Sequence, residues 1–369
     1  LSIDIPKILI YIFIPSVLIF SSYDTSWHYD EGFYHLNHQN WLRESNMIIG
    51  TINISWTYGM SSIYEYISSI LWIDKSYILI HFLSLIFIHV FYIFLFENVN
   101  NTINNSLKNI SLLLIVFSLL DNFGIEGGRN GFLYIQGVTK QDMAIAVLVL
   151  MIFIFGVLSI STNKLNSTEL FILSTIVLLA IQIKISSLVI IYILIVCIFK
   201  SFYFKLLNNR AFFVSIASSV FFATNWLIKN YLTTGCFMFP ITFTCKNNFA
   251  WYVEGSTKEF ETISTTASYA FIDYFYKNLT FQNWFRDFLS FEINKVVLSN
   301  FLISFLLIIF LKLIFSYKNV NMFITNFTMY SFVFIYAVYL ILYGPIPRYL
   351  TGLFLIIIAF IGFNIKNFK

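Results

Sequence analysis

Apolar runs separated by short polar segments recur along almost the whole chain. They predict ten membrane-spanning helices, at about 8–22, 77–96, 110–121, 142–160, 169–183, 185–199, 211–228, 296–315, 322–343 and 349–364. The run 58–73 is interrupted by Ser61, Ser62, Tyr64, Glu65 and Tyr66, so we expect an amphipathic helix at the membrane interface there. The pattern therefore predicts an all-α polytopic membrane protein in which residues 1–369 form a single integral membrane domain.

Composition and charge agree with this prediction and suggest an orientation. Hydrophobic residues make up 59% of the chain and charged residues 11%, whereas soluble proteins average about 25% charged residues. With the N-terminus inside, the inner segments carry ten basic and three acidic residues, and the outer segments twelve basic and fifteen acidic. Both termini are then cytoplasmic, and the large loops 23–76, 121–141 and 229–295 face outward. The short inner segments leave no room for a nucleotide-binding domain, and we expect no nucleic-acid partner.

The first outer loop concentrates the ionisable side chains of an otherwise charge-poor protein. Between Tyr23 and Tyr66 it holds three histidines and five acidic residues. If the segment after Asp30 is helical, one continuous stripe forms on its surface, made of Asp30, Glu31, Tyr34, His35 and His38. A carboxylate in such a stripe suits a general base. Asp30 is preferred because it lies nearest the end of the first span, Glu31 is the alternative, and the sequence does not separate the two.

The same stripe has a second interpretation as a metal site. His28 together with the carboxylates and histidines of the stripe could supply nitrogen and oxygen ligands to a divalent ion. The spacing matches no compact metal motif, so no metal or other cofactor is the expectation. A third interpretation is a solvated helix face, which fits His38 better than Asp30.

Four cations are expected on the same side of the membrane as the stripe. Lys184 lies between two runs too short for ordinary spans, since 169–183 rises only about 22 Å as a helix against a hydrocarbon core of about 30 Å. Arg348 follows two prolines in the turn YGPIPRYLTG, Arg129 lies in the glycine-rich loop 121–141, and Lys229 closes the seventh span. Such groups can hold a lipid phosphate, although headgroup anchoring explains them too.

The three cysteines do not form a disulfide framework. Cys236 and Cys245 both fall outside the predicted membrane segments and can form a small disulfide loop. Cys197 lies inside a predicted span, where we expect it to pack as an ordinary apolar side chain.

Several segments carry a resemblance to a known superfamily: DEGFYHLNHQNWLRE, GTINISWTYGMSS, NWLIKNYLTTGCFMFP and GPIPRYLTG. They resemble a family of bacterial polytopic membrane proteins with the fold of the GT-C membrane glycosyltransferases. The matching positions are Asp30, Tyr34, His35, Trp41, Gly50, Asn53 and Gly59. Members tend to have arginine where this chain has Lys229, which keeps the charge but loses the bidentate geometry.

The resemblance implies a function and a set of site residues. It implies transfer of a sugar from a polyprenyl-phosphate donor to a glycan or lipid-linked acceptor, without a metal, on the outer face of the bacterial cytoplasmic membrane. Besides the donor and the acceptor, the expected partners of the protein are membrane lipids. The expected catalytic residues are Asp30, Glu31, Tyr34 and His35. The expected substrate-binding residues are Asn53, Arg129, Lys184, Lys229 and Arg348.

Three alternatives remain open at this point. A polymerase or ligase of O-antigen type would use a lipid-diphosphate donor and an arginine-rich late loop, yet the loop 229–295 has no dense arginine cluster. A transporter or flippase of lipid-linked sugars would show internal repeats and a site near the bilayer midplane, and neither is evident. An inactive assembly subunit would tolerate replacement of Asp30, Lys184 and Arg348.

Overall fold

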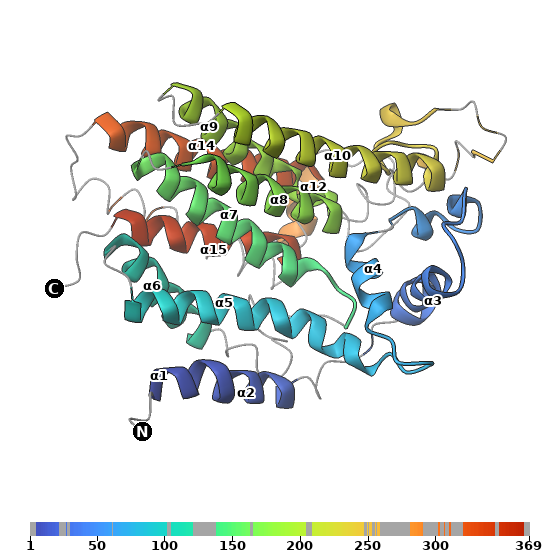
Figure 1. Cartoon of the computed structure of the whole chain (residues 1–369), viewed down its shortest axis with the longest axis horizontal. Helices are drawn as coiled ribbons and strands as arrows, with labels where there is room; N and C mark the ends of the chain where they lie inside the picture. Colours follow the sequence, from blue (N-terminus) through green and yellow to red (C-terminus); the bar gives the residue numbers. More distant parts are fainter. Residues whose placement is uncertain are drawn as a thin grey trace.

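Figure 1 shows the computed structural model of the chain, a bundle of roughly parallel and antiparallel helices. The structure describes residues 5–21, 30–60, 62–101, 105–120, 138–162, 165–203, 209–246, 281–290, 320–343 and 347–364, with Trp27 and single positions between 249 and 310. Helices account for nearly all of this described part, which contains no strand beyond two isolated bridges. The predicted all-α class is therefore confirmed.

The longer helices keep the order of the predicted runs. Their bounds are α1 Ile5–Ile8, α2 Ile14–Ser21, α3 Leu36–Glu44, α4 Ile63–Ile70, α5 His81–Asn101, α6 Asn105–Leu120, α7 Asp142–Thr162, α8 Ser167–Ile183, α9 Ile191–Tyr203, α10 Asn209–Thr234, α12 Phe281–Ser290, α14 Val320–Tyr343 and α15 Pro347–Asn364. Short helical turns join them: η1 Leu9–Phe13, η3 Glu31–His35, η4 Thr51–Asn53, η5 Trp56–Met60, η6 Ile78–Ile80, η8 Ile185–Ile190 and η9 Thr242–Thr244.

The number of membrane spans differs from the prediction of ten. Within the described part, four helices are long and apolar enough to cross a membrane, at Ile78–Asn100, Asp142–Thr162, Ile185–Tyr203 and Phe212–Thr234. The described residues of five other predicted runs give apolar helical stretches of 10–17 residues, whereas a straight span needs about 20; among these, only the full helix α14, with 24 residues, exceeds that length. The remaining run, 296–315, lies outside the continuously described segments. The long apolar helices are compatible with an integral membrane protein.

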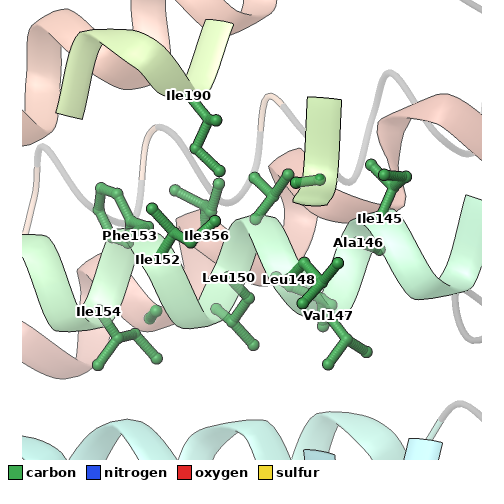
Figure 2. Close-up of a cluster of buried hydrophobic side chains, with 14 of the residues drawn as sticks. Ile145, Ala146, Val147, Leu148, Leu150, Ile152, Phe153, Ile154, Ile190 and Ile356 are labelled. Atoms are coloured by element: carbon green, nitrogen blue, oxygen red, sulfur yellow. The ribbon is translucent and has the colours of Figure 1, made fainter. Parts of the chain in front are cut away.

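Helix α7 lies at the centre of the bundle, and 78% of its apolar window is buried. It is apolar on every side because α5, α8, α9, α14 and α15 all pack against it. Figure 2 shows buried side chains on both sides of α7, with Phe153 on the side of Ile190 and Ile356 and Leu150 on the opposite side. Gly156 allows the close approach of α9, because a Cβ there would lie 2.3 Å from Cγ2 of Ile193.

The chain reverses at Lys184, as the two short apolar runs on either side of it predicted. Helix α8 begins with a reciprocal capping box between Asn166 and Glu169 and ends at Ile183. Lys184 then has extended backbone dihedral angles, and the chain returns through η8 and α9. The C-terminal part of α9 lies beside α7 again, where Lys200 donates a hydrogen bond to the carbonyl of Ile160.

The polar segments gather at one end of the bundle, on the right in Figure 1. The loop at Gly50 attaches to the C-terminal end of α10 through a hydrogen bond from its N–H to the Leu232 carbonyl, 3.0 Å long. The segment 58–73, expected to be an amphipathic helix, contains η5 and the eight-residue α4, which is too short to span a membrane. The predicted disulfide between Cys236 and Cys245 is confirmed.

Candidate active site

The helix that carries the predicted stripe is present and begins where the sequence indicated. Asp30 caps a π-helical turn, η3, and α3 follows without interruption. A π-helical turn inserts an extra residue into the helical repeat, and such turns occur frequently at functional sites. As a result the stripe faces two neighbours: Asp30 and Glu31 lie against the start of α7, while His35 and His38 lie against α4.

The first of these contacts is a carboxylate pair beside a lysine. Lys140, two residues before α7, forms an ion pair with Asp30, and both side chains are largely buried. Glu31 is completely buried, and its Oε1 accepts a hydrogen bond from the Thr139 N–H at 3.4 Å. Its Oε2 has no hydrogen-bond partner among the residues that the structure describes. The chain therefore holds one of two adjacent carboxylates in an ion pair and buries the other.

The environment of Glu31 changes its proton affinity. Burial raises the pKa of Glu31 from 4.5 to about 7, although the hydrogen bond from Thr139 and the charge of Lys140 act in the opposite direction. A carboxylic acid with this pKa exchanges its proton near neutral pH, which is the property of a general acid or base. Adjacent carboxylates in unlike environments are a common arrangement in acid–base catalysis.

The second contact is a buried carboxylate between two imidazoles. Glu65 on α4 binds Nδ1 of His35 through one oxygen and Nδ1 of His38 through the other. Burial by itself raises the pKa of Glu65, but the charge of His38 and the hydrogen bonds of both rings outweigh it and lower the pKa below its ordinary value. The tilted ring of Tyr34 lies 4.1 Å from that of His35, centroid to centroid. This cluster fixes α3 against α4.

Lys184 lies at the same end of the bundle and is paired within the protein. It forms an ion pair with Asp142, the first residue of α7, and its Nζ lies 4.1 Å from the ring centroid of Tyr349. A small cavity lies beside the pair, lined partly by Ser186 and Tyr336. An ion pair accounts for a lysine at this depth, so the expected phosphate contact is not required to explain its position.

Lys229 and Asn53 occupy other parts of the same region. Lys229, on α10, places Nζ 3.7 Å from the ring centroid of Trp226 and 5.5 Å from that of Tyr66, next to Glu65 in the chain. Asn53 donates a hydrogen bond to the carbonyl of Trp251. Asn53 therefore ties together two segments of the chain.

The structure brings together most, though not all, of the predicted site residues. Asp30, Glu31, Tyr34, His35, Lys184 and Lys229 share one end of the bundle through their contacts with α4, α10 and the start of α7, and their common side of the membrane stays a prediction. Arg129 and His28 lie outside the described residues, as does the side chain of Arg348, the second residue of α15. No group of three or more histidine, cysteine or acidic side chains that could hold a metal ion occurs in the described segments.

Three partners of these residues were not predicted to be in the site. Lys140 forms an ion pair with Asp30, Asp142 forms one with Lys184, and Glu65 binds His35. Each of these partners lies in another segment of the chain than the residue that it contacts. A usable signal existed for Glu65, because it is the only acidic residue in the run 58–73 and a histidine-rich helix precedes it. Nothing in the local sequence pairs Lys140 with Asp30, 110 residues away.

The comparisons with known proteins give a family but no activity. A family model described as Domain of unknown function (DUF8201) matches residues 2–355. Neither a curated protein nor a solved structure matches the chain.

Proposed function

The chain belongs to the family that this model describes, and we propose that it is a membrane glycosyltransferase acting on a polyprenyl-phosphate-linked sugar. The acceptor is a hydroxyl group of a glycan or of a lipid-linked sugar. The reaction takes place at the end of the bundle that holds Asp30 and Glu31, on the outer face of a bacterial cytoplasmic membrane. The motif resemblance of this segment and the chemistry of its side chains both support this proposal.

One observation carries the proposal: the unequal environments of Asp30 and Glu31. The sequence favoured Asp30 as the base, but Asp30 forms an ion pair with Lys140. Glu31 has a raised pKa and one oxygen without a hydrogen-bond partner in the described part of the chain. We therefore assign the general base to Glu31 and a supporting electrostatic role to the Asp30–Lys140 pair.

The proposed reaction is a displacement at the anomeric carbon of the donor sugar. Glu31 accepts the proton of the acceptor hydroxyl. The oxygen of that hydroxyl forms the new glycosidic bond to the anomeric carbon. The bond between the anomeric carbon and the phosphate oxygen breaks, and the electron pair leaves with the polyprenyl phosphate. Cations at the same end, Lys140 among them, favour this negatively charged leaving group electrostatically.

Transfer from defined donors tests the proposal. Purified protein in lipid nanodiscs is incubated with a panel of synthetic polyprenyl-phosphate hexoses and a glycan acceptor, and the released polyprenyl phosphate is measured. The wild type should release it from at least one donor, and Glu31→Gln should lower the rate by about 10²-fold or more. Glu44→Gln, which removes an exposed carboxylate from the same helix, is the matched control and should retain the rate.

The same series distinguishes the two carboxylates and the rival function. A larger loss in Asp30→Asn than in Glu31→Gln would return the base to Asp30. If the wild type released no phosphate from any donor but moved the labelled donor between leaflets of proteoliposomes, a transporter would replace the transferase.

A further inference from the structure

A groove lies between α8 and α10 at the end of the bundle opposite the carboxylates. Its volume is about 480 Å³, and its lining comprises Ser167, Thr168, Phe171, Arg210, Val214, Ser215 and Ser218. Both helices begin at this end, since α8 terminates beside Lys184 and α10 terminates beside the loop at Gly50. The groove is thus separated from the proposed active site by the length of the bundle.

Short serine side chains bring the two helices together and leave room at their ends. The hydroxyl of Ser219 on α10 donates to that of Ser174 on α8 at 3.1 Å. Nearer the helix starts, the Ser215 hydroxyl donates to the Ser167 carbonyl at 3.4 Å. Small polar residues allow close packing of membrane helices. Because they fill little volume, the larger side chains of Phe171 and Val214 form the walls of a hollow.

The polar part of the groove suits an anionic group with several oxygens. Arg210 is exposed at the beginning of α10, and a guanidinium can donate two parallel hydrogen bonds to a phosphate. The hydroxyls of Thr168 and Ser218 line the same space and can donate as well.

The apolar part of the groove continues onto the outer surface of the bundle. Phe171 and Val214 are 37% and 59% exposed, and Phe213 and Phe221 extend the apolar surface along α10 at 68% and 64%. Only 11% of the apolar window of α10 is buried within the bundle. An acyl chain can lie along this surface while its headgroup lies beside Arg210.

We infer that this groove binds the headgroup of an anionic phospholipid. The phosphate lies against Arg210 and the groove hydroxyls, and an acyl chain follows the exposed face of α10. Basic pockets between membrane helices are known to hold anionic lipid headgroups. The inference is independent of the proposed transferase activity, because it concerns the other end of the bundle.

Native mass spectrometry of delipidated protein tests the inference, with phosphatidylglycerol and phosphatidylcholine as probes. The wild type should bind one phosphatidylglycerol with at least about tenfold preference, the effect of one good charge-assisted contact. Arg210→Gln should abolish the preference, and Arg210→Lys should retain part of it. Arg43→Gln removes an exposed arginine from α3 at the opposite end and should leave binding unchanged.

A second variant tests the groove without changing charge. Ser218→Phe fills the hollow and should weaken phosphatidylglycerol binding as strongly as Arg210→Gln, with thermal unfolding confirming that both variants are folded. An unchanged lipid preference in either folded variant would overturn the inference. Competition by glycerol phosphate at the same concentration as the lipid would likewise overturn it, in favour of a site for soluble anions.

Discussion

Replacing Glu65 with glutamine should loosen the attachment of α3 to α4. Glu65 is 3% exposed, and each of its oxygens serves one imidazole, that of His35 or that of His38. Glutamine has nearly the same size but only one acceptor oxygen. The NH₂ group of the glutamine would face the Nδ1–H of one histidine, so that two donors would meet. One buried hydrogen bond would therefore be lost.

The expected cost follows from these two contacts. A hydrogen bond to a charged group contributes about 1.5–3 kcal/mol, and breaking a buried ion pair costs about 3–5 kcal/mol. A loss of about 3 kcal/mol corresponds to roughly a 10²-fold change in an equilibrium constant. Local separation of α3 from α4 should become more frequent by this factor, while the α7 core is unaffected.

Hydrogen exchange measures this local opening directly. Peptides that cover α3 and α4 should exchange about 10²-fold faster in Glu65→Gln than in the wild type at neutral pH. Peptides from α7 should not change, and neither should any peptide in the exposed control Glu44→Gln. Unchanged protection of α3 in Glu65→Gln would show that the cluster does not hold the helix.

The pH dependence gives a second, independent readout. The pKa of Glu65 in the folded protein lies below its ordinary value of 4.5, because the charge and hydrogen bonds of His38 and His35 outweigh the effect of burial. A lowered pKa stabilises the fold above pH 4.5, and this stabilisation is lost as the pH falls through the folded-state pKa. The difference in stability between the wild type and Glu65→Gln should therefore shrink as the pH is lowered below about 4.5.

Three further predictions concern the remaining charges and one close contact. Because the pKa of Glu31 is raised in the folded protein, the contribution of Glu31 to stability is complete below pH 4.5 and is lost as the pH rises through about 7. Glu31→Gln should therefore raise the melting temperature at pH 8 while lowering transferase activity. Asp142→Asn should cost about 3–5 kcal/mol by leaving Lys184 without its carboxylate, whereas Asp142→Leu combined with Lys184→Met should cost less; thermal unfolding compares them. Gly59→Ala should destabilise by about 1–3 kcal/mol in the same measurement, since a Cβ would lie 2.7 Å from the ring of Phe239.

The apolar pattern predicted helices well and membrane spans poorly. Hydrophobic runs locate α7 and the reversal at Lys184 correctly, because both depend on local sequence. The runs at 110–121 and 169–183 are themselves short, and their helices α6 and α8, of 16 and 17 residues, stay below the length of about 20 residues that a straight span needs.

The candidate site could be predicted only as far as its residues lie close together in the chain. The helix from Asp30 and the position of His35 on it follow from local spacing. The contacts of these residues with Lys140 and Glu65 join segments 110 and 30 residues apart. Such pairs depend on how helices pack, and hydrophobic periodicity describes each helix separately.

The two carboxylate clusters are connected by the geometry of a single short helix. Helix α3 has only nine residues, a length that is marginal for a helix in isolation. Its position therefore depends on tertiary contacts, among which are the Glu65 cluster and the 3.0 Å hydrogen bond from the Trp72 indole to Gln39. The π-helical turn η3, which precedes α3 without interruption and is flanked by Asp30, carries Glu31 into its buried place. The contacts that hold α3 against α4 thereby also maintain the burial that raises the pKa of Glu31.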